Sequence, residues 1–187
     1  GLLSGRVGAG SPETELRRYN TNTETDGDQV VTTTDGEPAV HGEYHVDGIP
    51  GTGARIDSYF RDPGGSVTGR LLPTGDRRET VTVAGKDYPV SIVDAANPNV
   101  FLRARDLGLD GTELPDELAD SDLLDRLELI RGAACERLGL VDDRRDAVDD
   151  RPAIPQIALV SDPQSFGTVS GGRVDGTDID ITSRIVT

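Results

Sequence analysis

Short runs of β-branched and aromatic residues, separated by glycine-containing turns, fill the first half of the chain and limit the folds open to it. In some runs an apolar or aromatic residue stands at every second position, as at Tyr88, Val90 and Ile92. This alternation is typical of a half-buried strand. Pairs such as Asp35-Gly36 indicate turns, because glycine accepts a positive φ. We therefore expect strands over residues 30–34, 43–46, 55–60, 80–83 and 88–93. Later in the chain we expect a buried strand over 157–160 and a final element over 179–186.

One segment has the period of a helix instead. Its apolar residues recur at steps of three or four and would form one face: Leu123, Leu127, Ile130, Ala134 and Leu138. We expect Ser121 to cap the start of this helix and Gly139 to end it. Cys135 lies beside the apolar face and should be buried or half-buried, and the acidic residues 141–150 should form a solvated loop. The sequence thus predicts an α+β protein.

The charge balance excludes some partners. The 187 residues include 19 basic and 34 acidic side chains, for a net charge of −15, so we expect no nucleic acid and no membrane as partner. Lys86 is the only lysine, and an acidic surface almost without lysine is typical of proteins that work in concentrated salt; an acidic protein of ordinary cytoplasm is the alternative. A single cysteine, which can form no internal disulfide, fits a cytoplasmic protein.

Three patterns that could hold ligands have simpler explanations. Residues 64–71 have the glycine spacing of a phosphate loop, but Arg70 and Leu71 replace its lysine and hydroxyl residues, so we expect a turn. His41 and His45 could lie on one face of a strand, yet no third metal ligand accompanies them, and residues 175–180 lack the glycine and glutamate of a calcium loop. We expect no metal site.

Two other segments are better candidates for a binding site. Residues 46–54 join two expected strands through glycines that could turn main-chain N–H groups toward an anion, although a plain linker would look the same. Residues 90–101 form an apolar strand interrupted by aspartate, small residues and Asn97-Pro98, which would let a ligand approach backbone and amide together.

These segments belong to an ordered series that resembles the PrpF family, which contains 2-methylaconitate cis-trans isomerase, methylitaconate isomerases and oxalomesaconate tautomerases. The strings are YNTNT at 19–23, DGIPGTGA at 47–54, DPGGSVTGRLLPTG at 62–75, VDAANP at 93–98 with VF at 100–101, and DLGLDGTELP at 106–115. The resemblance implies a diaminopimelate-epimerase-like fold of two similar domains, each a mixed sheet around a helix, with the active site between them. Residues 1–50 would end the first domain and 51–187 begin the second, both incomplete in a chain that starts at Gly1 and has no methionine.

The resemblance also implies the chemistry. Family members need no cofactor: they remove a proton next to a carboxylate or conjugated system and return one to the same or a vinylogous carbon. Negative charge then collects on carboxylate oxygens, which N–H donors stabilise. By analogy with the family's Asn-Pro motif, Asn97 and Pro98 are the leading candidates for binding the substrate. Gly51, Thr52 and Gly53 would supply backbone donors, and Asn20 and Asn22 would add amides.

The sequence departs from the family where catalysis is concerned. The family's catalytic lysine and cysteine motifs do not occur here: Lys86 lies in an expected hairpin and Cys135 in the expected helix, so neither takes that role. Ala96 also replaces the usual glycine, and a positive φ there would shift the loop that carries Asn97.

We therefore expect a cofactor-independent isomerase of methylaconitate-like unsaturated polycarboxylates. An oxalomesaconate-type tautomerase, or a racemase or epimerase of the same fold, stays open, as does a noncatalytic carboxylate-binding or structural segment. The expected partner is a small polycarboxylate, and a homodimer stays open as the assembly.

Overall fold

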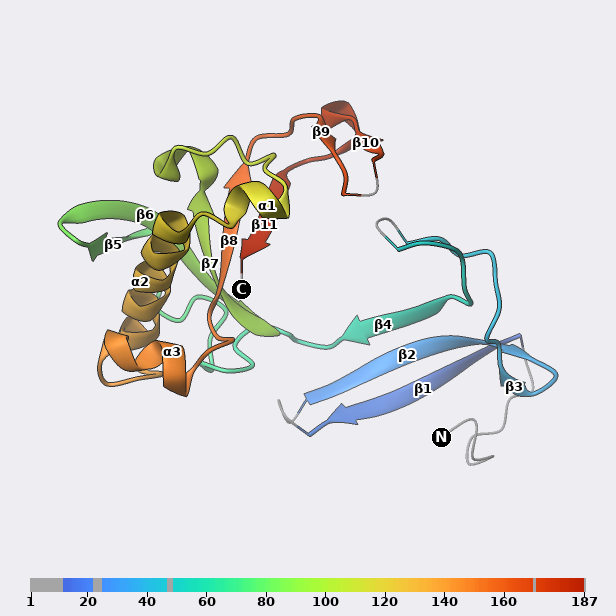
Figure 1. Cartoon of the computed structure of the whole chain (residues 1–187). Coiled ribbons are helices and arrows are strands. Elements are labelled where there is room, and N and C mark those ends of the chain that lie inside the picture. The colour runs from blue at the N-terminus through green and yellow to red at the C-terminus, as the bar shows by residue number, and fades with distance from the viewer. Residues whose placement is uncertain (1–11, 22–24, 47–48, 170, 187) are drawn as a thin grey trace. The chain divides into compact units, whose positions relative to one another are not determined.

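The computed structural model describes residues 12–21, 25–46, 49–169 and 171–186. The chain divides into two compact units, Gly1–Asp62 and Pro63–Thr187 (Figure 1). The expected boundary at residues 50 and 51 lies within the first of these units. The physical reason is that strand β4 (Ile56–Phe60) pairs with β2 (Thr25–Thr34), so the residues after Gly51 complete the sheet of the first unit.

The first unit is an antiparallel sheet. Strand β1 (Glu13–Asn20) and β4 flank β2, and the two-residue strand β3 (Glu37–Pro38) pairs with the end of β2 after the Asp35-Gly36 turn. The strand expected over 43–46 does not form, since the segment pairs at one position only, between Tyr44 and Gly53. Gly42 explains the close approach, because a Cβ there would lie 2.5 Å from the carbonyl oxygen of Gly53.

The second unit contains a five-stranded mixed sheet in the order β11-β8-β7-β6-β5. Neighbouring strands are antiparallel except for β7 and β8, which run parallel and are joined by a helical crossover. The strands are β5 (Glu79–Val83), β6 (Lys86–Ala95), β7 (Asn97–Arg103), β8 (Gln156–Ser161) and β11 (Thr182–Val186). Short two-residue strands, β9 (Phe166–Gly167) and β10 (Arg173–Val174), pair with each other.

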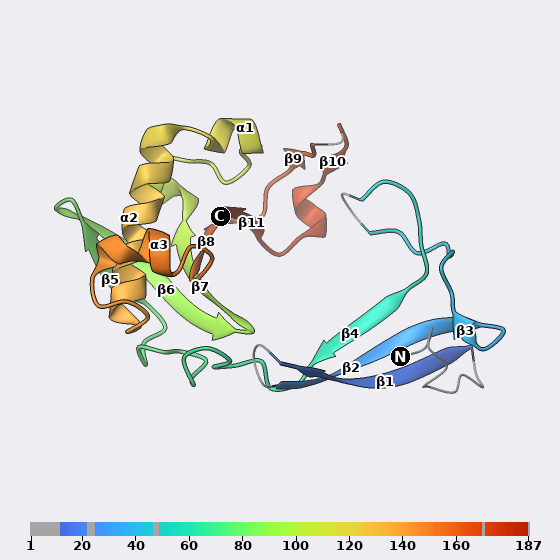
Figure 2. The same ribbon diagram turned by 60° about the horizontal axis from the view of Figure 1, so that its bottom comes forward.

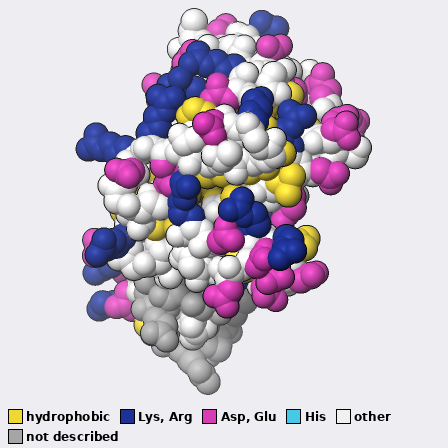
Figure 3. Space-filling model, turned by 90° about the vertical axis from the view of Figure 1, so that its left-hand side faces the viewer, with side chains coloured by type: hydrophobic (Ala, Val, Ile, Leu, Met, Phe, Trp, Pro, Cys, Tyr) yellow, Lys and Arg dark blue, Asp and Glu magenta, His cyan; other side chains and the backbone are white. Residues whose placement is uncertain are grey.

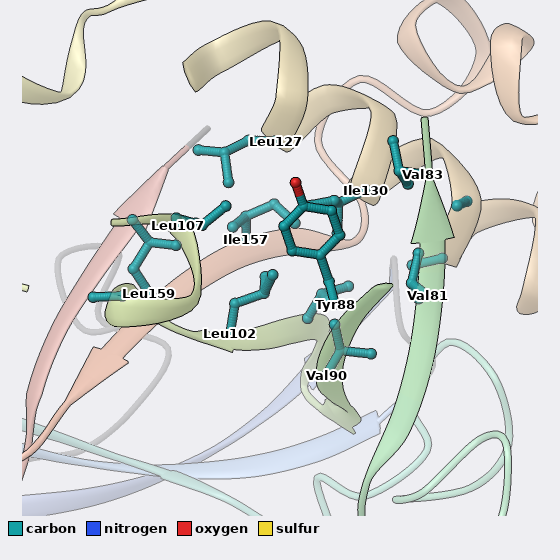
Figure 4. Close-up of a cluster of buried hydrophobic side chains, with 14 of the residues drawn as sticks. Val81, Val83, Tyr88, Val90, Leu102, Leu107, Leu127, Ile130, Ile157 and Leu159 are labelled. Atoms are coloured by element: carbon teal, nitrogen blue, oxygen red, sulfur yellow. The ribbon is translucent and has the colours of Figure 1, made fainter. Parts of the chain in front are cut away.

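The long helix of this unit is α2 (Ser121–Arg137), and it covers one face of the sheet (Figures 1 and 2). Its apolar stripe packs against alternate residues of the strands, as Figure 4 shows for Leu127 and Ile130 facing the side chains of Tyr88 and Leu102. The expected stripe is confirmed, and Gly139 follows the helix with φ +68°. The expected cap was wrong by one residue: Asp120, whose carboxylate accepts the N–H of Leu123, caps the helix.

Short helical segments complete the second unit, and two of them, Arg144–Asp146 and Ala147–Asp150, pack against α2. They are the 3₁₀ segments Ala104–Leu107, Arg144–Asp146 and Gly176–Asp178 and the helices α1 (Pro115–Leu118) and α3 (Ala147–Asp150). The acidic stretch after α2 is therefore not a simple solvated loop, because Val141 and Ala147 are buried against Cys135. Within the described residues, no helix is both long and apolar enough to cross a membrane.

Candidate functional site

The corner between β6 and β7 carries the first of the sequence-predicted site residues. Ala95 and Asn97 are register partners, so Ala96 alone joins the two strands, with φ +69°. Asn97 is exposed, whereas Pro98 is fully buried and anchors the start of β7 in the sheet. Within the described part of the chain, the side-chain amide of Asn97 has no hydrogen-bond partner. It is therefore available to a ligand in solvent.

A glycine-rich segment runs along this corner and holds it from one side. Asp94 makes two main-chain hydrogen bonds to this segment: its carbonyl accepts the Gly65 N–H at 2.8 Å, and its N–H donates to the Leu71 carbonyl at 2.9 Å. The Ala96 N–H donates to the Pro63 carbonyl at 2.7 Å. Gly65 has φ +81°, and a Cβ there would lie 2.4 Å from the nitrogen of Arg70. Glycine is thus required at this position for both conformation and space.

The side chain of Asp94 is the polar centre of the corner. It is fully buried, and its Oδ2 accepts the N–H groups of Val67 and Thr68 at 2.9 and 2.7 Å and the Thr68 hydroxyl at 2.8 Å. The Ser66 hydroxyl lies 3.3 Å from Oδ1. We call Asp94 with residues 66–68 the Asp94 lock. A buried carboxylate is strongly unfavourable without such donors, so the glycine-rich turn and the aspartate stabilise each other.

The Asp94 lock explains the resemblance of residues 64–71 to a phosphate loop. The turn does point successive N–H groups at an anion, as phosphate-binding loops do. Here the anion is the protein's own carboxylate, so the N–H groups of Val67 and Thr68 are occupied. The prediction of a turn at this place is confirmed.

The other predicted site residues lie in the first unit, and the structure does not bring them together there. Asn20 ends β1 opposite Thr25, whereas Gly51, Thr52 and Gly53 precede Ile56, which pairs with Val31. Six residues of extended strand separate Thr25 from Val31, or about 20 Å. Asn22 lies outside the described residues.

The glycine segment of the first unit offers fewer donors than expected. The N–H of Gly53 donates to the carbonyl of Tyr44 at 3.0 Å, and the N–H of Tyr44 donates back to Gly53 at 3.1 Å. The amide of Gly53 is therefore occupied in this structure. Gly51, with φ +86°, and Thr52 are exposed.

Cys135 and Lys86 lie in structural settings, as expected. Cys135 is fully buried, its thiol lies 3.4 Å from the carbonyl oxygen of Ile154, and burial raises the pKa of the thiol. Lys86 follows the Ala84-Gly85 hairpin turn, where its ammonium donates to the carbonyl of Asp106 and lies 4.9 Å from the centroid of the Tyr88 ring. Among the described residues, no cluster of potential metal ligands is found.

A cavity of about 510 Å³ lies at the far end of β7 from Asn97. Arg103, Arg105, Ser161, Gln164 and Asp180 are among its lining residues, and Gln164 donates to the Ser161 hydroxyl at 3.1 Å. The length of β7 separates this cavity from Asn97 by about 20 Å. Sequence reasoning missed it, because its walls come from the ends of β7 and β8, which are distant in sequence.

Comparison of the sequence with known proteins identifies the family of the chain. A sequence model described as "PrpF protein" matches residues 1–187. The chain belongs to the PrpF family. It is 38% identical over 182 residues to "3-methylitaconate isomerase" of Eubacterium barkeri, covering 96% of this chain and 48% of the relative. It is 31% identical over 159 residues to "2-methyl-aconitate isomerase" of Shewanella oneidensis, covering 82% and 40%.

A solved PrpF-type structure shares the fold. The chain superimposes on the crystal structure of methylitaconate-delta-isomerase with a TM-score of 0.88 and 37% identity, over 99% of this chain and 48% of that one. The predicted family and the α+β, diaminopimelate-epimerase-like fold are thus confirmed. The chain spans about half the length of the curated relatives it matches.

Proposed function

We propose that the protein containing this PrpF chain is a cofactor-independent isomerase of methylaconitate-like unsaturated polycarboxylates. The observation that carries the proposal is the match, over 96% of the chain, to a relative named 3-methylitaconate isomerase. The corner geometry supports it: an exposed asparagine amide stands on a rigid turn, which is the kind of donor that a carboxylate needs.

The proposed reaction moves one proton and one double bond. A base removes a proton from a carbon next to a carboxylate or conjugated system, and the electron pair spreads onto the carboxylate oxygens. An acid then returns a proton to the same or a vinylogous carbon, so that atoms and charge balance. Asn97 donates its amide N–H to the charged oxygens, which stabilises the intermediate. Neither Lys86 nor the buried Cys135 is assigned to proton transfer.

We also propose substrate contacts at Gly51, Thr52 and Asn20. They rank below Asn97 as candidates. The exposed main chain at Gly51 and Thr52 supports a role as backbone donors. Gly53 takes part only if its bond to Tyr44 opens. Asn22 is proposed on the sequence alone.

An oxalomesaconate-type tautomerase is the second candidate within the same chemistry. The chain is 36% identical over 170 residues to "4-oxalomesaconate tautomerase" of Pseudomonas putida, covering 90% of this chain and 44% of that protein. Both candidates shift a double bond along a conjugated polycarboxylate. They differ in the substituent that the site must accept.

The experiment is to incubate the protein with methylitaconate, 2-methylaconitate and oxalomesaconate in deuterium oxide and to follow each by proton NMR. We expect one methyl-substituted substrate to isomerise with incorporation of deuterium, at a rate that EDTA does not change. Turnover of oxalomesaconate alone would favour the tautomerase. Turnover of none of the three, by a folded protein, would favour a noncatalytic carboxylate-binding segment.

We also propose that the protein works in a salt-rich cytoplasm. The supporting observations are the 34 acidic against 19 basic residues and the single lysine, Lys86. On the face drawn in Figure 3, Asp and Glu side chains lie among basic ones. Exposed ion pairs such as Arg145–Asp143 add little at high salt. Urea unfolding at increasing KCl tests this: stability should rise with salt, and a stability independent of KCl would contradict it.

A homodimer is proposed as the assembly, with no nucleic acid or membrane partner. The net charge of −15 supports the exclusion of polyanionic partners. Sedimentation equilibrium of the protein in KCl measures its mass directly. A monomer at micromolar concentration would contradict the dimer.

A further inference from the structure

We infer that Asp94 is a positioning residue for Asn97: the Asp94 lock holds the β6–β7 corner in the one conformation that presents the Asn97 amide to substrate. This inference rests on the proposed function of Asn97. It concerns a residue whose own side chain is fully buried.

The first step is the closeness of the two residues in the hairpin. Asp94 pairs with Pro98, and Ala95 pairs with Asn97. Asp94 is therefore in the strand pair next to the one that contains Asn97. Pro98 is as fully buried as Asp94. The only unpaired residue between the strands is Ala96, and its backbone dihedrals decide the direction in which Asn97 leaves the corner.

The second step is that Ala96 has an unfavourable conformation. Its φ of +69° is rarely adopted by a residue with a Cβ, so the surrounding structure must enforce it. The enforcing contact is the bond from the Ala96 N–H to the Pro63 carbonyl. Pro63 begins the same glycine-rich segment, and residues 66–68 of that segment donate hydrogen bonds to the Asp94 carboxylate. The lock therefore acts on Ala96 through that segment.

The third step is the choice of a carboxylate. Apolar side chains could fill this place without the cost of burying a charge. A carboxylate adds direction, because each oxygen must face its donors, and Oδ2 binds Thr68 through both its N–H and its hydroxyl. Loss of the hydroxyl should loosen the turn while the two N–H bonds keep the segment in place.

The test compares Thr68→Val with Thr68→Ser in the protein that carries this chain, using the methyl-substituted substrate that it turns over. Asp94→Asn replaces one acceptor oxygen with an NH2 group that faces other donors, and this can unfold the unit, so the milder Thr68 variants carry the test. Thr82→Val is the control for the substitution itself, because it deletes a hydroxyl–carboxylate bond of similar length, 2.7 Å to Asp87, in the exposed β5–β6 hairpin away from the corner.

We expect Thr68→Val to lower kcat/KM about tenfold, and Thr68→Ser and Thr82→Val to stay within about twofold of wild type. In an Asn97→Ala background, Thr68→Val should cause no further loss, because the lock acts through that amide. Equal additional losses in both backgrounds would overturn the inference and leave Asp94 as a merely stabilising residue. Wild-type kcat/KM in Thr68→Val would overturn it as well.

A second readout keeps this result distinct from failure of the proposed function. If the wild-type protein turns over no substrate, the proposed function fails, and the side-chain amide signal of Asn97 in ¹⁵N NMR, assigned by its absence in Asn97→Ala, still reports on the lock. Thr68→Val should shift or broaden that signal and Thr82→Val should not. An unchanged Asn97 signal in a folded Thr68→Val protein would overturn the inference.

Discussion

The main-chain N–H of Ala96 donates a 2.7 Å hydrogen bond to the carbonyl oxygen of Pro63 while Ala96 holds φ at +69°. The resemblance to PrpF proteins had singled out this position because alanine replaces the usual glycine. The structure shows that the alanine adopts the positive φ that suits glycine. The corner thus keeps its conformation at a cost in strain.

Ala96→Gly should therefore stabilise the protein. Removing the Cβ relieves about 1–2 kcal/mol of strain, partly offset by the greater freedom of glycine in the unfolded chain. Urea unfolding should show a free energy of unfolding higher by about 0.5–1 kcal/mol. Ala95→Gly, in the adjoining strand, is the control and should destabilise. A loss of stability in Ala96→Gly would contradict the positive φ.

Arg131 should be the most costly arginine of α2 to remove. It is buried, donates to Glu128 at 2.6 and 2.7 Å, and reaches the carbonyl oxygens of Ala147 and Ile154 at 3.0 and 3.3 Å. Arg131→Ala removes the guanidinium from the Glu128 carboxylate and from both carbonyls, and should lower the free energy of unfolding by about 2–4 kcal/mol.

Arg126→Ala on the same helix is the control for Arg131, because Arg126 has no ion pair among the described residues. It should change stability by less than about 0.5 kcal/mol. Equal effects of the two substitutions, measured by urea unfolding, would show that the buried contacts of Arg131 contribute nothing.

Asp120 and Ser121 distinguish the observed helix cap from the expected one. Asp120→Ala removes the acceptor for the Leu123 N–H, at 2.9 Å, and should cost about 1 kcal/mol of stability. Ser121→Ala replaces the first helical residue and should be neutral or slightly stabilising. The opposite ranking in thermal unfolding would restore Ser121 as the cap.

Cys135 should be unreactive in the folded protein. Burial raises the pKa of its thiol, so the thiolate that attacks disulfide reagents is scarce at pH 8 as well as inaccessible. Reaction with a chromogenic disulfide should be slow until urea unfolds the chain. Fast labelling under native conditions would contradict the burial.

The same raised pKa predicts a dependence of stability on pH. The neutral thiol is favoured in the folded state, so its contribution is complete below the unfolded pKa of about 8.5 and is lost as pH rises through the higher folded value. Between pH 8 and 10, wild type should lose more stability than Cys135→Ala. Parallel curves for the two proteins would contradict this.

Local signals in the sequence predicted the local parts of the fold. The helix with Leu123 and Ile130 on its buried face and the hairpin at Ala84-Gly85 depend on neighbouring residues, and both formed as expected. Strand β1 was not predicted because its residues are largely charged and polar. Only Thr14 in this strand is buried, with less than a tenth of its surface exposed. The strand expected around Tyr44 failed because tertiary pairing there reaches one partner only.

The sequence indicated the exposed asparagine of the candidate site but not the buried residues beneath it. Asn97 stood out as an amide that interrupts an apolar strand, and the structure places it on an exposed corner. The role of Asp94 depends on donors 26 and 27 residues earlier in the chain, and no local pattern links them. The glycine spacing at residues 64–71 was the only trace of that arrangement.

The most direct test of the central claim is the rate of deuterium incorporation into methylitaconate or 2-methylaconitate by wild type and by Asn97→Ala. We predict that wild type labels the substrate and that Asn97→Ala does so about 100-fold more slowly, with a free energy of unfolding within about 0.5 kcal/mol of wild type. Equal labelling rates would remove Asn97 from the site. Turnover by wild type without any labelling would contradict a proton-transferring isomerase.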